Sequence, residues 1–266
     1  MTRVLSGIVL IVLAVAAVWL SPAWLFLVIA ELLIVLACHE FAGLAKASNL
    51  PFPTVVSTLA AGLVCASFAQ AAFGGTARVP LDVALMTAFV TLGAMSLPAW
   101  RGGRDALATA ASAMFPCLYF GLPIGALVAI REAAGPQGLF LLMLTVMVSD
   151  SAQYYTGRAF GRRKLAEIIS PKKTIEGAYG GFVFGAIVLA VVGQWWLPTV
   201  PVVLRLLLGA TIVGLGIAGD LFESMLKRSA GVKDSSSLIP GHGGVLDRID
   251  ALLFAAPVYY VVLKYV

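Results

Sequence analysis

The chain has 266 residues, of which 61% are hydrophobic and only 12% are charged. A soluble domain carries about 25% charged residues, so this composition leaves too few polar groups to cover a water-exposed surface and excludes an ordinary soluble protein. The net charge of +5 does not require nucleic acid, because basic loops that face anionic lipid head groups explain it. We therefore expect an integral membrane protein whose surroundings are the lipid bilayer, with no nucleic-acid partner.

Nine apolar runs follow one another along the chain, and each is near the ~20 residues that a helix needs to cross a bilayer. Because the runs are continuous rather than alternating, they favour helices over the strands of a barrel. They cover residues 4–20, 22–45, 54–73, 81–99, 106–130, 137–157, 178–196, 202–222 and 250–265. No clear A-x-A cleavage site follows the first run, so we expect a spanning helix there rather than a signal peptide. The predicted fold class is all-α: a polytopic membrane helix bundle of about nine transmembrane helices.

The basic residues are divided unequally between the two sides of this predicted bundle. All but four of the 18 lysines and arginines fall on the side that holds the N-terminus. The exceptions are Arg78, Arg131, Arg205 and Lys264. Because cytoplasmic loops carry an excess of Lys and Arg, we expect a cytoplasmic N-terminus in a bacterial-type plasma (inner) membrane.

Two connections are long and polar, at residues 158–177 and 223–249, and both fall on the predicted cytoplasmic side. Most of the acidic residues lie in or beside them: Asp150, Glu167, Glu176, Asp220, Glu223, Asp234, Asp247 and Asp250. A simple anchor has no need to gather both charge signs in two loops. We therefore divide the chain into N-terminal transmembrane helices, 1–136, and a C-terminal catalytic region, 137–266, whose active site faces the cytoplasm.

The first polar connection contains the motif "SPKKTIEG". Ser170-Pro171 predicts a turn, or the start of a new helix with proline at its first position. Lys172 and Lys173, bracketed by hydroxyl residues, suit phosphate oxygens. Plain anchoring of a cytoplasmic loop is the alternative interpretation of the two lysines.

The second polar connection combines carboxylates with a lysine. Asp220, Glu223 and Lys227 have the spacing of one helix face, and Asp247 and Asp250 lie three residues apart at the start of the last apolar run. Magnesium in proteins is held by one or two carboxylates together with substrate phosphate oxygens. These carboxylates are therefore candidate metal ligands in phosphoryl-type chemistry on a lipid.

Glycines surround a histidine in the same connection, in the sequence "GHGG". Glycine allows backbone N–H groups to approach a phosphate closely, and a following helix N-terminus adds a favourable dipole. Gly243 and Gly244 are therefore candidate phosphate contacts. His242 is either a structural residue or a group that contacts substrate or carries a proton, and the spacing alone leaves both open.

The segment 224–250 resembles the signature of phosphatidate cytidylyltransferases, also called CDP-diacylglycerol synthases. That pattern reads S-x-apolar-K-R, four residues, K-D, a small residue, then P-x-H-G-G-apolar-x-D-R-apolar-D. The matching positions are Ser224, Leu226, Lys227, Arg228, Lys233, Asp234, Ser236, Pro240, His242, Gly243, Gly244, Val245, Asp247, Arg248, Ile249 and Asp250. The upstream "SPKKTIEG" is similar to the family's S-P-x-K-T-x-E-G, whereas the N-terminal half resembles the family only in hydropathy.

This resemblance implies that CTP and phosphatidic acid react to give CDP-diacylglycerol and pyrophosphate, with Mg²⁺ and a second cation, in an enzyme that is a homodimer. It implies Asp220 and Asp247 as principal metal ligands, with Glu223 or Asp250 next. The groups expected to neutralise or bind phosphate are Lys227, Arg228, Lys233, Arg248, Lys172 and Lys173, together with Ser170, Gly243 and Gly244. His242 is expected first as a positioning group, because a phosphate monoester is already largely ionised at pH 7.

Two other interpretations of the sequence stay open at this point. The same carboxylates would serve a CTP-dependent nucleotidyl or phosphoryl transfer to another lipid phosphate or a polyprenol. A membrane transporter is a more distant possibility, with Glu31, His39 and Glu40 of the second apolar run as an ion path, since ionisable groups inside a membrane are usually functional.

Overall fold

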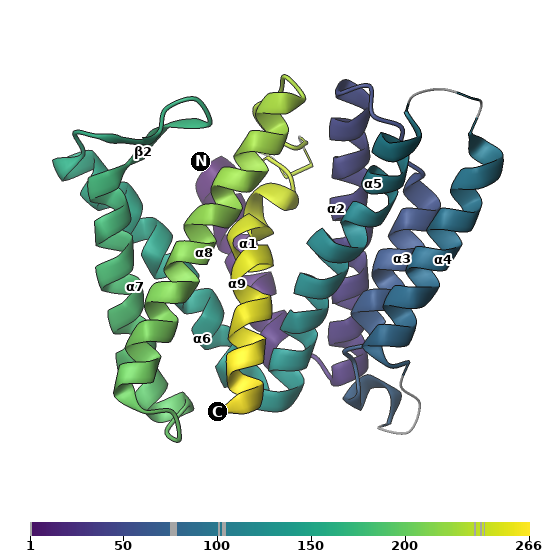
Figure 1. Cartoon of the computed structure of the whole chain (residues 1–266). Coiled ribbons are helices and arrows are strands. Elements are labelled where there is room, and N and C mark those ends of the chain that lie inside the picture. The colour runs from purple at the N-terminus through teal and green to yellow at the C-terminus, as the bar shows by residue number, and fades with distance from the viewer. Residues whose placement is uncertain are drawn as a thin grey trace.

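Helices make up most of the chain in its computed structural model, which describes residues 2–266 except 75–78, 101, 103, 104, 237, 240 and 242 (Figure 1). The side chains of residues 2–5, 98 and 99 are also outside this description. The prediction of an all-α membrane protein is confirmed in its class. Arg78, Pro240 and His242, named above, lie outside the described part, as do Arg101, Arg104 and the side chain of Arg3, which were counted among the basic residues of the predicted cytoplasmic side.

Helical segments occupy each of the nine predicted apolar runs. In the first half of the chain they are α1 (Thr2–Leu20), α2 (Ala23–Ala47), α3 (Thr54–Ala66), the 3-10 turn η1 (Ala71–Phe73), α4 (Leu81–Ala99) and α5 (Ala106–Pro116). In the second half they are the π-helical turn η2 (Cys117–Gly121), α6 (Leu122–Phe160), α7 (Ile175–Trp196), α8 (Val202–Ser229) and α9 (Leu246–Tyr265). The third helix is shorter than its predicted run, 54–73, because it ends at Ala66.

The continuous helical path from α5 to α6 contains one sharp break, at Gly135. Its φ of 69° and ψ of 179° are accessible essentially to glycine alone. Pro136 follows, and proline is well suited to the first position of a new helix. Figure 1 shows the chain descending through α5 and rising again along the rest of α6. The break therefore separates the fifth and sixth predicted runs.

Four helical stretches in the described part are long and apolar enough to cross a membrane: Ala23–Ala47, Ala106–Phe160, Ile175–Trp196 and Val202–Ser229. Ser6–Leu20, Thr54–Ala66 and Leu81–Leu97 are shorter apolar helices. Many large apolar side chains point outward from the bundle, among them Val55, Leu59, Phe89, Leu107 and Trp195. A soluble protein rarely exposes so much contiguous apolar surface, so these faces fit contact with lipid.

A short antiparallel hairpin interrupts the helices between α6 and α7. Strand β1 (Lys164–Ala166) pairs with β2 (Ser170–Thr174), and Ala166 lies opposite Ser170. The prediction of a turn or helix start at Ser170-Pro171 is wrong, because both residues belong to β2. The helix begins only at Ile175, where the Thr174 hydroxyl accepts a hydrogen bond from Gly177 N at 3.1 Å and so caps α7.

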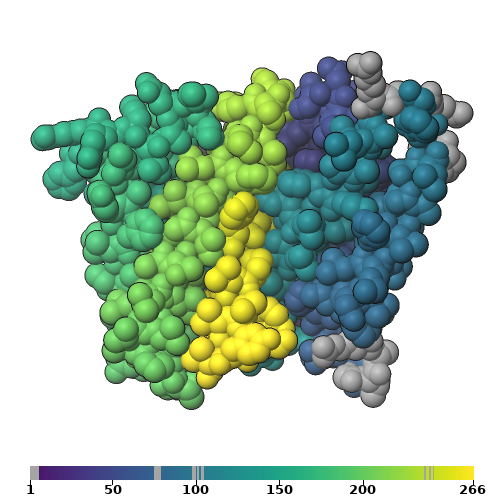
Figure 2. Space-filling view, viewed as in Figure 1, coloured from purple at the N-terminus to yellow at the C-terminus, as the bar shows by residue number. Residues whose placement is uncertain are grey.

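The C-terminal helices pack closely because small residues line their contacts. A Cβ atom on Gly177 of α7 would lie 2.7 Å from the backbone oxygen of Gln153 in α6. A Cβ atom on Gly219 of α8 would lie 2.5 Å from the backbone oxygen of Asp250 in α9. Figure 2 shows α9 at the surface between α8 and the α5–α6 segment. These contacts join α6 to α7 and α8 to α9 near their polar ends.

Both polar connections lie at the same end of the bundle. Figure 1 places the β1–β2 hairpin, the end of α8 and the start of α9 at the top, together with the end of α2, while the C-terminus lies at the bottom. The buried core below them contains residues of both halves of the chain, including Ile34, Phe120, Leu141 and Tyr259. The fold therefore presents one charged end above an apolar body.

The break at Gly135 can be tested by adding a single methyl group. We expect Gly135→Ala to lower the free energy of unfolding by about 1–3 kcal/mol, because an alanine must adopt the same sparsely populated backbone conformation. Gly43→Ala is the matched control: Gly43 lies within α2 and a Cβ there meets nothing within 4 Å. Thermal unfolding of the two variants in detergent micelles measures the difference. Equal melting temperatures would contradict the proposed conformational requirement.

Candidate functional site

Lys227 forms the centre of a first charged group at the polar end. Its Nζ pairs with Glu223 Oε2 one turn earlier in α8 and with Asp247 Oδ1 at the start of α9. Glu223 is fully buried and Lys227 is 8% exposed. Neither oxygen of Glu223 has a well-oriented hydrogen-bond donor among the described residues, so the lysine charge is what compensates its burial. The triad fastens α9 to α8.

Asp247 is also the centre of the segment that precedes α9. Its Oδ2 accepts hydrogen bonds from Ser235 N at 3.1 Å, from the Ser235 hydroxyl at 2.8 Å and from Gly244 N at 2.8 Å. Both carboxylate oxygens of Asp247 are therefore engaged by the protein. In this structure the residue predicted as a principal metal ligand holds the glycine-containing segment against α8.

The two glycines leave room for carboxylates in this structure. Gly243 has a φ of +76°, and a Cβ atom on it would lie 2.7 Å from Asp247 Oδ2. A Cβ atom on Gly244 would lie 2.3 Å from Glu40 Oε2 and 2.1 Å from the Ser235 hydroxyl. Close backbone approach is thus required here by carboxylates and a hydroxyl. The phosphate contact expected of these glycines stays a prediction. His242, beside them, lies outside the described residues.

Glu40 of α2 completes this arrangement and was not among the predicted site residues. It is 3% exposed and accepts hydrogen bonds from the hydroxyls of Ser235 and Ser236 and from the backbone N–H groups of Val245 and Leu246. The only sequence signal was an acidic residue near the end of an apolar run, which entered only the distant transporter alternative. Its oxygens are instead occupied by the segment before α9.

A second charged group brings together the hairpin, α6, α8 and α9. Lys173 Nζ lies 2.5 Å from Asp220 Oδ2, and Asp250 interacts electrostatically with Asp220, Asp150 and Lys173. Three carboxylates thus share one lysine. With three carboxylates to one lysine, this group keeps a larger formal excess of negative charge than the Lys227 triad, which has two, and this excess favours a bound cation. Asp150 was noted in the sequence only as a polar residue near a helix end.

The second charged group is suited to bind a magnesium ion whose remaining ligands would be phosphate oxygens of the substrate. Asp220 and Asp250 belong to helices whose backbones meet at Gly219, and carboxylate oxygens are the ligands that Mg²⁺ prefers. Among the residues that the structure describes, no three acidic, histidine or cysteine side chains lie close enough together to hold a metal ion by themselves. Magnesium commonly uses only one or two carboxylates together with waters and phosphates, so Asp220 and Asp250 are sufficient donors.

The remaining predicted basic residues are exposed to solvent. This set comprises Lys172, Arg228, Lys233 and Arg248. Arg228 donates a hydrogen bond to Val232 O at 3.2 Å. Lys172 and Lys173 are adjacent in a strand, so their side chains point to opposite faces, and Lys173 alone reaches Asp220. The exposed cations lie on elements at the same end of the bundle and are accessible to an anionic ligand.

The "SPKKTIEG" motif mainly builds the hairpin and joins it to α7. Glu176 accepts hydrogen bonds from the backbone N–H groups of Arg162 and Arg163 at 3.0 and 3.2 Å, and it pairs with the Arg163 side chain at 3.1 Å. Thr174 caps α7, and Ser170 is paired within the hairpin. These contacts fix the position of β2 and therefore of Lys173 beside Asp220.

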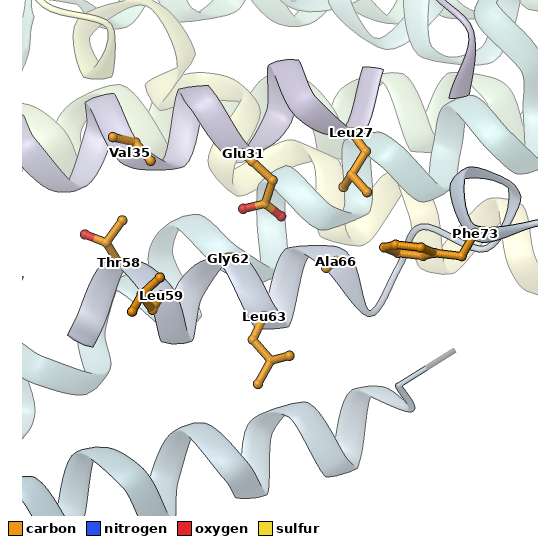
Figure 3. Close-up of a pocket in the computed structure, with 9 residues that line it drawn as sticks. All are labelled: Leu27, Glu31, Val35, Thr58, Leu59, Gly62, Leu63, Ala66 and Phe73. Atoms are coloured by element: carbon orange, nitrogen blue, oxygen red, sulfur yellow. The ribbon is translucent and has the colours of Figure 1, made fainter. Parts of the chain in front are cut away.

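A cavity of about 350 Å³ lies between α2 and α3, well away from the charged groups. Its lining is apolar except for Thr58 and Glu31, and Figure 3 shows Glu31 directed into the space between the two helices. Glu31 precedes Glu40 by nine residues, about 14 Å along a helix axis. This cavity is therefore separate from the polar end that carries the phosphate-binding candidates.

Comparison with known proteins identifies relatives of this chain. The model of the cytidylyltransferase family matches residues 1–266. The chain is 48% identical over 130 residues to a phosphatidate cytidylyltransferase of Haemophilus influenzae, covering 46% of this chain and 45% of that protein. It is 44% identical over 135 residues to one of Pseudomonas aeruginosa, covering 50% of each. These matches span about half the length of those relatives.

A more distant relative matches nearly from end to end. The chain is 32% identical over 264 residues to a phosphatidate cytidylyltransferase of Helicobacter pylori, covering 99% of this chain and 92% of that protein. The similarity therefore extends into the N-terminal half, where the sequence alone indicated only a shared hydropathy pattern.

The Lys227 triad predicts that replacing Lys227 lowers the stability strongly, and that a second substitution restores part of the loss. Lys227→Met leaves the Glu223 carboxylate buried without a counter-charge, and we expect a loss of about 3–5 kcal/mol in the free energy of unfolding. The double variant Glu223→Gln/Lys227→Met removes both charges and should recover much of that loss. Lys172→Met, which changes an exposed lysine, is the control and should be nearly neutral. Denaturation in detergent micelles measures the free energy of unfolding of each variant. Equal destabilisation of the single and double variants would contradict the predicted role of the Lys227 charge.

Proposed function

Because this chain belongs to the cytidylyltransferase family, we propose that it transfers the cytidylyl group of CTP to phosphatidic acid, giving CDP-diacylglycerol and pyrophosphate. The observation that carries this proposal is the charged end of the bundle. There, the carboxylates around Asp220 and Asp250 and several exposed cations lie above an apolar body. A lipid phosphate at a membrane surface and a soluble nucleotide would meet at such an end.

In the proposed reaction, an oxygen of the phosphatidate phosphate attacks the α-phosphorus of CTP. The bond from the α-phosphorus to the bridging oxygen breaks, and pyrophosphate leaves with that oxygen. The attacking phosphate is already ionised at neutral pH, since its second pKa is about 6, and no strong general base is needed. The residues of this chain therefore have to position two anions and reduce their repulsion.

Within this proposal, Asp220 and Asp250 would hold Mg²⁺, and Asp150 would add negative charge nearby. Mg²⁺ when bound supplies neutralisation of the phosphate oxygens. Asp247 and Glu223 were also expected as ligands from the sequence. Both pair with Lys227, so they would have to release this lysine before they could bind the cation. A second cation is a further part of the proposal and rests on the resemblance alone.

The exposed cations and the hairpin have separate roles in the proposed mechanism. Arg228, Lys233 and Arg248 would bind the phosphates of CTP, and Lys172 the lipid head group or the triphosphate. Lys173 would keep Asp220 oriented until substrate enters, because the two groups already form an ion pair. The charge of Lys227 would act through Asp247, whose segment carries Gly243, Gly244 and His242.

We also propose the orientation and assembly of the protein. The charged end faces the cytoplasm of a bacterial-type plasma membrane, supported by the excess of lysine and arginine on that side. Nine transmembrane helices are supported by the helical segments found in each predicted run. A homodimer follows only from the resemblance and stays a prediction.

The proposed activity can be measured as pyrophosphate release by purified protein in detergent with CTP and Mg²⁺. We expect release only when phosphatidic acid is present, because its phosphate is the proposed nucleophile. Release without lipid would overturn the proposal. Release restored by a polyprenyl phosphate but absent with phosphatidic acid would move the activity to the alternative acceptor class.

The proposed metal ligands predict a strong effect of removing one negative charge. We expect Asp220→Asn and Asp250→Asn each to reduce turnover by about 100-fold or more, the scale of losing one electrostatic contact in a transition state. Chelation of Mg²⁺ should abolish turnover in the unaltered protein. Asp82→Asn, at the start of α4 and the other end of the bundle, is the control. A folded Asp220→Asn protein with normal turnover would exclude Asp220 as a ligand.

A further inference from the structure

Glu40 makes four hydrogen bonds to a segment about 200 residues further along the chain. Its Oε1 accepts from the Ser236 hydroxyl at 2.7 Å and from Val245 N at 2.8 Å. Its Oε2 accepts from the Ser235 hydroxyl and from Leu246 N, both at 2.9 Å. A carboxylate with only 3% of its surface exposed is thus fully satisfied by groups of the signature segment.

These contacts supply α9 with the cap that its own sequence lacks. The first N–H groups of a helix have no partner within the helix and are normally satisfied by a side chain just before it. The residue at that position is Val245, which offers no side-chain hydrogen bond. The negative charge of Glu40 lies at the positive end of the helix dipole, where an anion is stabilised. Glu40 of α2 therefore determines where α9 begins.

The Ser235 hydroxyl connects Glu40 to Asp247. It lies 2.9 Å from Glu40 Oε2 and 2.8 Å from Asp247 Oδ2. A hydroxyl carries one proton, so it donates to one of the two carboxylates at a time. Gly244 touches the same pair: its N–H donates to Asp247 Oδ2, and a Cβ atom on it would overlap Glu40 Oε2. A displacement of Glu40 must therefore displace the groups around Asp247.

We propose that Glu40 is a positioning residue of the active site, through which α2 fixes Ser235, Ser236 and the start of α9, and thereby Asp247, Lys227 and Arg248. This inference rests on the proposed function and extends it to the N-terminal half of the chain. Glu40 is too buried to contact a substrate, so its effect must pass through the segment that it holds. The carboxylate is required for this role because its two oxygens accept from the backbone N–H groups of Val245 and Leu246 and from the Ser236 hydroxyl, and they share the Ser235 proton with Asp247.

Glu40→Gln tests this role with little change in shape. The amide replaces one oxygen by an NH₂ group, which then faces the N–H of Val245 or Leu246 as donor against donor. We expect kcat to fall by about 10- to 100-fold, the range in which small displacements of reacting groups reduce rates, with the KM for phosphatidic acid changed less than about twofold. Glu40→Asp keeps two accepting oxygens and should recover part of the loss in kcat.

Glu31→Gln is the matched control, since it makes the same chemical change in the same helix. Glu31 lies in the α2–α3 cavity (Figure 3), whose lining residues all belong to α2, α3 and η1. We expect its kcat to stay within about twofold of the unaltered protein. Hydrogen exchange of the Val245 and Leu246 amides provides a readout that does not need activity: it should become faster in Glu40→Gln and stay unchanged in Glu31→Gln.

A second pair of variants separates the link to Asp247 from the general anchoring of the segment. Ser235→Ala removes the hydroxyl that touches both carboxylates. Ser236→Ala removes a hydroxyl that donates to Glu40, does not bond Asp247, and also accepts from Leu238 N. We expect a larger loss of kcat in Ser235→Ala than in Ser236→Ala. This comparison decides the question if Glu40→Gln does not fold.

The experiments distinguish failure of the Glu40 positioning role from failure of the proposed function. A folded Glu40→Gln protein with normal kcat and normal exchange would overturn the positioning role, as would equal effects of the two serine substitutions. If the unaltered protein releases no pyrophosphate, the proposed function fails, and amide exchange alone then decides whether Glu40 holds the segment. Faster exchange confined to the start of α9 would support the positioning role in that case as well.

Discussion

The charge of Lys227 is the interaction on which the polar end of the bundle depends. It lies between the fully buried Glu223 and Asp247, and without it two negative charges would remain in a region that water barely reaches. A buried ion pair gains little over an apolar contact, but breaking one is costly because a bare charge stays behind. The triad thus fixes the relation of α8 to α9, and Asp247 in turn fixes the glycine-containing segment.

The two charged groups differ in how completely they are compensated, and this difference suits different tasks. Asp247 receives a lysine and three hydrogen-bond donors, so it is suited to hold structure. Asp220, Asp250 and Asp150 each accept one hydrogen bond. Among the described residues, Lys173 is the one lysine that compensates all three, so they are suited to attract a cation. Exposed arginines and lysines at the same end would then receive the phosphates that accompany the metal. In our account, the first group builds the site and the second carries its chemistry.

Much of the fold could be predicted from the sequence because the membrane imposes a length on every apolar run. The break between runs five and six follows from Gly135-Pro136, and the polar loops follow from charge. The hairpin could not be predicted, since β1 is only three residues long and is held by Glu176 across the connection. The roles of Glu40 and Asp150 were also hidden. Their partners come from other helices, and neither residue belongs to a recognisable local motif.

The glycines of the signature illustrate the same limit. The sequence predicts that they allow backbone N–H groups to approach a phosphate, but sequence spacing does not identify the protein atoms that approach them. In the structure these are the oxygens of Glu40, Asp247 and Ser235, which reach Gly243 and Gly244 from α2, α9 and the preceding loop. A pattern that is typical of phosphate binding can therefore also arise from carboxylates that hold the loop in place. The N-terminal half is consequently part of the site, rather than only a membrane anchor.

The fate of the CTP phosphates tests the central claim most directly. Purified protein would be incubated with phosphatidic acid, Mg²⁺ and CTP carrying a radioactive label at either the α- or the γ-phosphorus, and the lipid would then be extracted. We predict label in the lipid from α-labelled CTP only, with the γ-label recovered in pyrophosphate. Label that enters the lipid from the γ-position would contradict cytidylyl transfer and assign the protein to CTP-dependent phosphorylation instead.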